Sequence, residues 1–350
     1  MQLFCVKILL TIMSDDNPES TIDMPFQAGS DACVMVNEKF GEQILLDYKR
    51  IKCYYITDGK TRDFRSEFMY KIVSKKSLNP TVTSMEIEAP FVAAKAEPGQ
   101  FIILRVDENG ERIPLTVAGY DREKGTVRII FQIVGATTAA LNQKNVGDSL
   151  QDFVGPLGVA TELDGLKKVC IIGGGVGCAI AMPIAQKLHE NGVDVTSIIG
   201  FRSHDLVILE DEFKNASNKL FVMTDDGSYG EKGNVCMPLN KMLNSGEKFD
   251  RIIAIGPLIM MKFVVEAAKP TGIPCTVSMN PIMIDGTGMC GGCRLTLNQD
   301  GRKVTKFACV DGPDFNGYEI DFDEAMSRGA MYREFERHAY EETCNLFNKE

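Results

Sequence analysis

The chain has 350 residues and a formal net charge of −10, with 44% apolar and 25% charged residues. This length suggests two or three globular domains, and the composition is typical of an ordinary folded protein. The negative charge argues against a nucleic-acid backbone as partner. Because no run approaches 18 consecutive apolar residues, the sequence predicts no membrane-spanning helix.

Eleven cysteines are scattered along the chain at irregular spacing, unlike the framework of a small secreted disulfide protein. A reducing compartment therefore fits better, and we expect a cytoplasmic location, with organellar targeting by the N-terminal extension left open. Cys170, Cys178 and Cys236 are interpreted as small buried hydrophobic residues.

Residues 1–68 form an N-terminal extension of unknown role. Residues 1–13 are apolar but lack a basic start and a small-residue cleavage site, so we do not interpret them as a signal peptide. Residues 14–31 are polar, and we expect them to be flexible. Residues 44–46 and 54–56 are candidate short strands.

Residues 69–165 are predicted to form a small antiparallel β-barrel. Apolar residues alternate in several short runs, separated by turn signals such as Asn109-Gly110. Short strands with turns at this spacing are typical of a barrel. The predicted strands lie at 70–73, 81–88, 101–106, 126–134 and 149–154.

Two stretches of this domain suggest a binding site. The run from Arg112 to Val117 closes a hairpin with a proline, and Gly135 to Thr138 ends a strand and enters a helix at 137–143. A helix start with free N–H groups and two hydroxyls attracts a pyrophosphate. Taken singly, Arg112 is equally a solvated charge and Thr138 a plain N-cap.

Residues 166–275 are predicted to form an α/β nucleotide-binding domain. A strand at 167–172 leads into a glycine turn at 173–177 and a helix at 178–189. Such a turn lets a dinucleotide pyrophosphate approach the helix N-terminus. The third glycine of G-x-G-x-x-G is missing, so a plain tight turn is the alternative. Further strands are predicted at 193–199 and 220–224.

Two more stretches follow strands of this domain. Asp225 and Asp226 begin a polar string after the strand at 220–224, at the edge where nucleotides bind. A polar turn is the alternative interpretation. Gly256 and Pro257 end the strand at 251–255.

Three cysteines and an aspartate lie close together near the C-terminus. Cys290 and Cys293 form a C-x-x-C pair, Cys309 follows after a gap of 15 residues, and Asp285 precedes them in a glycine-rich turn. Thiolates in short glycine-rich loops are typical ligands of iron–sulfur clusters. A [2Fe-2S] cluster is the preferred interpretation, and a zinc knuckle or inert thiols are the alternatives. Asp285 is the candidate fourth ligand, although carboxylates are less common than thiolates.

The remaining C-terminal sequence predicts supporting elements. A hairpin at 294–297 and 303–307 carries Cys309 back to the loop, residues 311–315 form a turn, and residues 322–347 form one or two surface helices. We assign residues 276–325 to a cluster-binding region and 326–350 to a helical tail. Cys344 is too far along the chain to be an expected ligand.

The motifs Arg112-Ile-Pro-Leu-Thr116, Gly135-Ala-Thr-Thr138 and Gly155-Pro-Leu-Gly158 together resemble the flavin-binding barrel of the ferredoxin–NADP reductase superfamily. The resemblance implies an FAD site. Its flavin- and pyrophosphate-binding residues would be Arg112, Ile113, Pro114, Leu115, Thr116, Phe131, Gln132, Ile133, Gly135, Thr137 and Thr138.

The same superfamily has a nicotinamide-nucleotide domain, which residues 166–275 resemble. Its "C-G-P" motif beside the nicotinamide has Ile255 in place of cysteine here, which removes a thiol near the hydride path. The implied contacts with NAD(H) or NADP(H) are Gly173, Gly174, Gly175, Gly177, Asp225, Asp226, Gly256 and Pro257. Arg202 leaves the choice between the two nucleotides open.

The order of barrel, nucleotide domain and cluster loop over residues 69–325 resembles two related families. One is the small (alpha) subunit of NADH-dependent reduced ferredoxin:NADP oxidoreductase, also called sulfide dehydrogenase. The other is the electron-transfer subunit of NAD-dependent dihydroorotate dehydrogenase. The D-G-T-G-M-C-G-G-C loop matches the first more closely, because the second usually has a cysteine where Asp285 stands.

The resemblance implies an oxidoreductase subunit that carries FAD, a [2Fe-2S] cluster and NAD(H) or NADP(H). The cofactors would carry the chemistry, so no side-chain acid or base is expected to be essential. The implied partner is a larger flavoprotein subunit with iron–sulfur clusters, in a heterodimer that reaches ferredoxin through that subunit. Its cluster loop, including Asp285, Cys290, Cys293 and Cys309, would lie near the subunit interface.

Overall fold

The computed structural model describes residues 32–37, 42–47, 52–57, 60–63 and 70–347. The chain divides into two compact units, Met1–Met69 and Tyr70–Glu350. The described strands of the first unit form one antiparallel sheet in the order β1 (Ala32–Asn37), β2 (Glu42–Asp47), β3 (Lys52–Thr57) and β4 (Lys60–Asp63). β2 and β3 confirm the two predicted strands, whereas the predictions for residues 1–31 lie outside the described residues.

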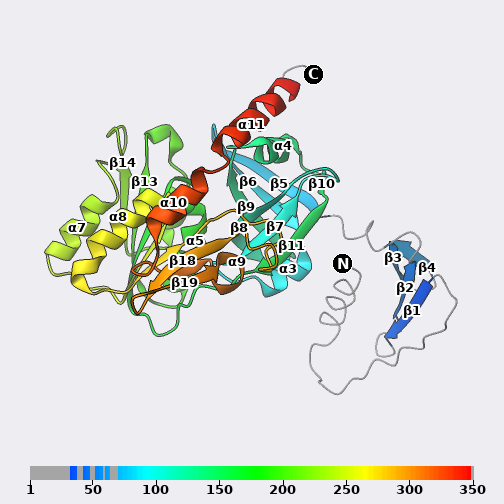
Figure 1. The fold of residues 1–350 in the computed structure, drawn as a ribbon, viewed down its shortest axis with the longest axis horizontal. Coiled ribbons are helices and arrows are strands. Elements are labelled where there is room, and N and C mark those ends of the chain that lie inside the picture. Colours follow the sequence, from blue (N-terminus) through cyan, green and yellow to red (C-terminus); the bar gives the residue numbers. More distant parts are fainter. Residues whose placement is uncertain (1–31, 38–41, 48–51, 58–59, 64–69, 348–350) are drawn as a thin grey trace. The chain divides into compact units, whose positions relative to one another are not determined.

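The second unit begins with the predicted antiparallel barrel, drawn in cyan and green in Figure 1. Its sheet has the strand order β10-β5-β6-β9-β8-β7-β11, and only Gln151 separates its two edge strands along the chain, so the sheet is nearly closed. The strands are β5 (Tyr70–Asn79), β6 (Val82–Glu88), β7 (Phe101–Arg105), β8 (Arg112–Asp121), β9 (Thr126–Gln132), β10 (Ser149–Leu150) and β11 (Asp152–Leu157).

Alternation along these strands explains the barrel core, because every second side chain points inward. The buried interior includes Met85, Ile87, Leu104, Ile129 and Phe153. Two short helices, α3 (Pro90–Lys95) and α4 (Ala136–Gln143), follow β6 and β9, and α4 confirms the helix predicted after Gly135.

A second sheet, parallel except at one edge, follows in the order β15-β14-β13-β12-β16-β17-β20. Only β20 runs antiparallel, beside β17. The strands are β12 (Lys168–Gly174), β13 (Asp194–Phe201), β14 (Lys219–Thr224), β15 (Glu231–Lys232), β16 (Arg251–Ile255), β17 (Cys275–Ser278) and β20 (Asp314–Asn316). Residues 311–315 were predicted as a turn, but Asp314 and Phe315 pair with the free edge of β17 instead.

Helices cover both faces of this sheet because alternate strand residues are apolar on both sides. Cys170 and Ile172 of β12 belong to the core under α7 (Cys236–Asn244) and α8 (Leu258–Ala268). Val169 and Ile171 belong to the core under α5 (Cys178–Glu190) and α6 (Glu210–Asn215), which the barrel also contacts. These layers confirm the predicted α/β fold.

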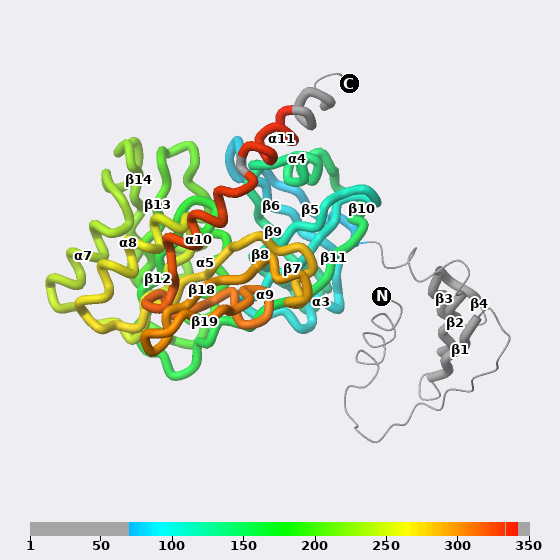
Figure 2. The backbone as a smooth tube through the Cα atoms, viewed as in Figure 1, coloured from blue at the N-terminus to red at the C-terminus, as the bar shows by residue number. Residues whose placement is uncertain are grey.

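The C-terminal region extends from β17 over both sheets. It contains the predicted hairpin β18 (Arg294–Gln299) and β19 (Arg302–Phe307), then α9 (Ala308–Asp311), α10 (Phe322–Ala330) and α11 (Arg333–Phe347). The tube in Figure 2 shows α10 lying beside α8 and α11 reaching α4, and these pairs are in contact. In the described part of the chain, no helix is long and apolar enough to cross a membrane.

The exact division of residues 69–350 at 165, 275 and 325 stays a prediction. The strand β20 shows why such bounds are hard to draw. It belongs to the parallel sheet, although it follows the cluster loop in the sequence.

Candidate functional site

The four predicted cluster ligands lie together in two pairs. Asp285 Oδ1 is 3.5 Å from Cys290 Sγ, and Cys293 Sγ is 3.0 Å from Cys309 Sγ. Two ligands ~2.0–2.3 Å from one tetrahedral metal are separated by roughly 3.5–3.8 Å, so each pair suits one iron with little movement. Two irons with two protein ligands each make up the ligand set of a [2Fe-2S] cluster.

The spacing of the four residues supports the same assignment. Asp285, Cys290, Cys293 and Cys309 stand in a D-x4-C-x2-C-x15-C series. It is the plant-type [2Fe-2S] spacing C-x4-C-x2-C with aspartate in the first position. Among the described residues, no three histidine, cysteine or acidic side chains gather around a single point as they would for one metal ion.

Glycines and the Asp285 side chain together shape the loop. Gly286 and Gly288 have positive φ angles of 74° and 84°. A Cβ on Gly288 would lie 2.8 Å from Val310 Cγ2, so a larger residue there would displace the segment that carries Cys309. Asp285 accepts hydrogen bonds from the backbone N–H groups of Thr287 and Cys290, both at 3.1 Å.

The Asp285 carboxyl is held in its ionised form. Burial raises its pKa, but the hydrogen bonds from Thr287 and Cys290 outweigh burial and leave the pKa below its usual range. An ionised oxygen ligand is what an iron site requires. The backbone N–H of Gly292 also donates to Cys290 Sγ at 3.4 Å, as N–H groups do around cluster sulfurs.

Burial differs between the two pairs of ligands. Cys293 and Cys309 are 0% and 2% exposed, whereas Cys290 is exposed at the surface. A cluster held here would have one iron toward the core and one toward the exterior. Cys170 and Cys178 are fully buried elsewhere, as predicted, and Cys236 is half-buried.

The predicted flavin strand lies on the barrel next to the cluster loop. Ile113 to Thr116 of β8 are half-buried, so they offer a partly covered surface, and the exposed Arg112 lies 3.8 Å from Asp152 of β11. Gln132 and Ile133 at the end of β9 are also half-buried. Phe131 is 1% exposed and belongs to the barrel core, and its contact with the flavin stays a prediction.

The start of α4 has the features expected of a pyrophosphate site, with one change of role. The Thr138 hydroxyl accepts hydrogen bonds from the N–H groups of Val134 and Gly135, both at 3.0 Å, and donates one to the Gly135 carbonyl oxygen at 2.9 Å, so it ties the residues that lead into α4 to its first turn. The Thr137 hydroxyl donates to Glu111 at 3.4 Å. The first-turn N–H groups have no partner within the helix and remain suited to an anion.

The glycine turn and Gly256-Pro257 meet at one edge of the parallel sheet, although about 80 residues separate them in the chain. A Cβ on Gly177 would lie 2.5 Å from the carbonyl oxygen of Ile255, and one on Gly174 would lie 3.1 Å from Pro257 Cδ. Gly175 has a φ of 55°. The glycines therefore permit a close backbone approach between α5 and the start of α8.

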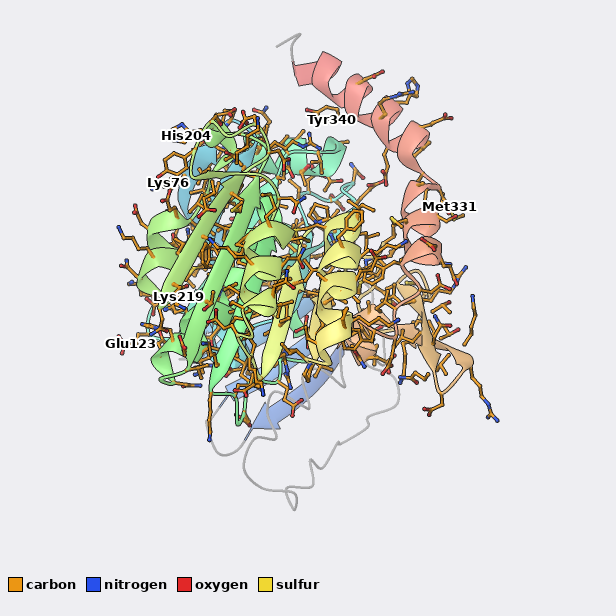
Figure 3. All side chains as sticks on the ribbon, turned by 90° about the vertical axis from the view of Figure 1, so that its left-hand side faces the viewer. Lys76, Glu123, His204, Lys219, Met331 and Tyr340 are labelled. Carbon is orange, nitrogen blue, oxygen red and sulfur yellow. The ribbon has the colours of Figure 1, made fainter. Side chains whose placement is uncertain are left out.

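The same edge contains two aromatic residues that the sequence analysis did not single out. His204 and Tyr229 stack with ring centroids 4.6 Å apart, and the backbone N–H of His204 donates to Ser228 Oγ. Asp225 and Asp226 are exposed beside them. Figure 3 shows His204 at the opposite end of the sheet from Lys219, where β14 begins. Their position after adjacent parallel strands was the signal available in the sequence.

Comparison with known proteins supports this assembly of sites. Residues 280–321 match the iron–sulfur cluster binding domain of dihydroorotate dehydrogenase B. A Thermotoga maritima protein named as a homologue of the electron-transfer subunit of NAD-dependent dihydroorotate dehydrogenase B is 47% identical over 271 residues. That match covers 77% of this chain and 94% of the relative. The Streptococcus pneumoniae electron-transfer subunit is 33% identical, covering 70% and 97%.

Among solved structures, the chain is similar to one from the NADH-dependent reduced ferredoxin-NADP oxidoreductase, described in connection with flavin-based electron bifurcation. The two are 46% identical with a TM-score of 0.73, and the match covers 78% of this chain and 97% of the other. The predicted resemblance and fold class are thereby confirmed. The chain belongs to the family of dihydroorotate dehydrogenase B electron-transfer subunits and their homologues.

Proposed function

We propose that the chain is the electron-transfer subunit of a ferredoxin:NADP oxidoreductase of the transhydrogenase type, carrying FAD and a [2Fe-2S] cluster in the cytoplasm. The observation that carries the proposal is the contact between the cluster loop and the flavin barrel. A Cβ on Gly286, next to Asp285, would lie 3.0 Å from Ile103 Cγ1. Ile103 pairs directly with Pro114 of the flavin strand. One strand thus separates the two predicted redox sites.

The residues of the chain bind and orient the cofactors. When bound, FAD would exchange a hydride with the nicotinamide and single electrons with the cluster. The half-buried surface of β8 and the N-terminus of α4 suit the flavin and its pyrophosphate. Gly177 and Gly256 approach closely because neither has a side chain, and the missing side chains leave room for the nucleotide at the sheet edge. Asp285 and the three cysteines hold the cluster.

A larger flavoprotein subunit is the proposed partner, in a heterodimer that gives access to ferredoxin. Exposed apolar residues surround Cys290 on the loop side: Ile284 is 54% exposed, Met289 79% and Val310 50%. Gly288, beside Met289, lies against Val310, so these side chains form one apolar surface near the exposed Cys290, which would hold the cluster. An electron leaving the cluster would cross this surface to a docked partner.

The electron-transfer subunit of dihydroorotate dehydrogenase is the second candidate, because the matching cluster domain and several relatives carry that name. Asp285 favours the first candidate. Copurification separates the two: the second requires a partner subunit that oxidises dihydroorotate.

Anaerobic purification tests the cofactor content. We expect one FAD per chain, two irons with two acid-labile sulfides, and a rhombic EPR signal after reduction. Zinc without flavin would refute the proposal. Titration with NADH and with NADPH then identifies the preferred nucleotide, which Arg202 and the neighbouring Asp226 leave open.

Asp285→Cys tests the fourth ligand. A thiolate donates more charge to iron than a carboxylate, so we expect the variant to keep its cluster and to show a changed reduction potential. Asp300→Asn at the tip of the β18–β19 hairpin is the matched control and leaves the potential unchanged. Loss of the cluster, or an unchanged potential in Asp285→Cys, would count against Asp285 as a ligand.

A further inference from the structure

Two arginine side chains converge on the short segment between Cys290 and Cys293. Arg294 Nη1 donates to the carbonyl oxygen of Gly291, and Arg328 Nη2 donates to that of Gly292, both at 3.4 Å. Gly291 and Gly292 are the two residues that separate these ligands in the chain. Both guanidinium groups therefore lie beside the position of the cluster.

The two arginines come from different elements. Arg294 begins β18 directly after Cys293, whereas Arg328 belongs to α10 of the C-terminal tail and is half-buried. Helix α10 is fixed at its start, where the Asp321 side chain caps the backbone N–H of Glu324 at 3.0 Å. An ion pair of 2.8 Å between Asp323 and Lys262 joins α10 to α8. The fold thus holds the Arg328 guanidinium against the loop.

In the part of the chain that the structure describes, the charges of these arginines face the loop without an ion-paired carboxylate. Among the ion pairs of the described residues, none includes Arg294 or Arg328. The lysines of the same hairpin differ, because Lys303 pairs with Asp321 and Lys306 with Asp311, both at 3.0 Å. The guanidinium group of arginine is positively charged, so both residues place positive charge beside the loop.

We propose that Arg294 and Arg328 raise the reduction potential of the [2Fe-2S] cluster. The inference rests on the proposed function, since it requires a cluster at Asp285, Cys290 and their partners. Reduction adds one electron, and hence one negative charge, to a site whose ligands are already anionic. A nearby positive charge stabilises the reduced form more than the oxidised form. Screening by solvent is limited on the inner side, where the cysteines are buried.

The positive charge of the two arginines beside the loop contrasts with the acidic character of the chain as a whole. The chain has a net charge of −10, which disfavours adding an electron anywhere on it. Two positive charges beside the loop offset that field at the place where the cluster would accept an electron. Arg328 acts on the cluster through the field and through the loop carbonyl, and it touches no reacting atom.

The test is an EPR-monitored redox titration of the full-length protein with its cofactors. We expect Arg294→Gln and Arg328→Gln each to shift the cluster potential to more negative values, and the double variant to shift it further. Arg302→Gln is the matched control. Arg302 pairs with Gln299 at the far end of the hairpin, whereas Arg294 pairs with Phe307 at the near end. The control should leave the potential unchanged.

Lysine variants separate the effect of charge from that of loop geometry. Arg328→Lys keeps the charge and loses the planar fork, so we expect it to retain most of the wild-type potential. The inference would be overturned if both glutamine variants had the same cluster potential as Arg302→Gln. It would also be overturned if the cluster potential of Arg328→Lys shifted as far as that of Arg328→Gln. If Arg328→Gln loses iron, the cluster potential of Arg294→Gln, where the substituted side chain is exposed, decides whether the inference holds. Absence of an EPR signal in the wild type would instead refute the proposed function itself.

Discussion

Gly177→Ala tests whether the glycine turn is shaped by the loop that begins α8. The backbone of Gly177 is helical, with φ −59° and ψ −21°, so alanine meets no torsional strain. The added Cβ would lie 2.5 Å from the carbonyl oxygen of Ile255 and 2.8 Å from the Cα of Gly256. Ordinary contacts begin at 3.4 Å, and both neighbours are backbone atoms that no rotamer change can move. The start of α5 must therefore separate from the end of β16.

Overpacking of this kind costs about 1–3 kcal/mol. If the whole cost fell on nucleotide binding, the Kd for NADH or NADPH would rise roughly 5- to 150-fold, because each 1.4 kcal/mol is a factor of ten. If it fell on folding, the Tm would fall by about 2–12 °C. The overlap of the added Cβ with the backbone sets the total free-energy cost. How far the turn relaxes decides how much of this cost falls on nucleotide binding and how much on folding.

The assay combines nucleotide binding, followed by NADH fluorescence, with thermal unfolding of the same preparation. Gly329→Ala is the control, because a Cβ at this helical position has no atom within 4 Å and alanine favours the helix. We expect this control to bind nucleotide normally and to unfold at the same or a slightly higher temperature. Wild-type affinity together with wild-type Tm in Gly177→Ala would refute the reasoning.

Three further predictions concern a contact between the barrel and α6, the start of α4, and a buried carboxyl. Arg128→Ala removes two hydrogen bonds, of 2.9 and 3.1 Å, to Glu212 of α6. Because the pair is partly exposed, we expect the free energy of unfolding to fall by about 1 kcal/mol and the Tm by roughly 2–4 °C. An unchanged Tm would contradict this prediction. Thr138→Ala removes the hydrogen bonds that tie Val134 and Gly135 to the first turn of α4, worth about 1 kcal/mol, and should lower the FAD retained per chain after gel filtration, whereas Thr138→Ser should retain it. Burial raises the pKa of Asp314, against smaller opposing effects of Thr161 and Ser278. The protonated carboxyl contributes stability below the ordinary pKa of aspartate, and this stability is lost as the pH rises through the raised pKa of Asp314. Asparagine does not titrate, so the Tm of Asp314→Asn should fall less than that of the wild type between these two pKa values. Equal pH dependence in the two proteins would refute it.

The features that were predicted correctly are those with local causes. The barrel strands follow from alternation. The cluster ligands stay a prediction, but the structure brings the four residues, all within one stretch of the chain, into two close pairs. In both cases the relevant neighbours are close in the chain, so spacing fixes geometry. The pairing of Asp285 with Cys290 is an example, because the turn that joins them is made by the hydrogen bonds of Asp285 itself.

The features that were missed depend on contacts over long distances in the chain. Arg328 lies 36 residues after Gly292 and reaches it only because α10 packs on α8. His204 and Tyr229 stack because they follow adjacent strands. The register of β9 turns the ring of Phe131 into the barrel, while its place on the flavin strand stays a prediction. A shift by one residue would have reversed that result, and sequence alone does not fix it.

The strand β20 explains how a mostly irregular cluster region keeps a defined place. The chain leaves the parallel sheet at Ser278 and returns at Asp314, and these two residues pair directly across β17 and β20. The N–H of Met279 also donates to the carbonyl oxygen of Pro313 at 2.9 Å. Both ends of the segment 279–313 are therefore tied to one point of the sheet, while Gly286 rests on the barrel at Ile103. Three attachments to two rigid sheets leave the loop little freedom to change its distance from the flavin strand. Electron transfer requires such a fixed distance, and strand pairing at the sheet edge provides it together with the contact of Gly286 on the barrel.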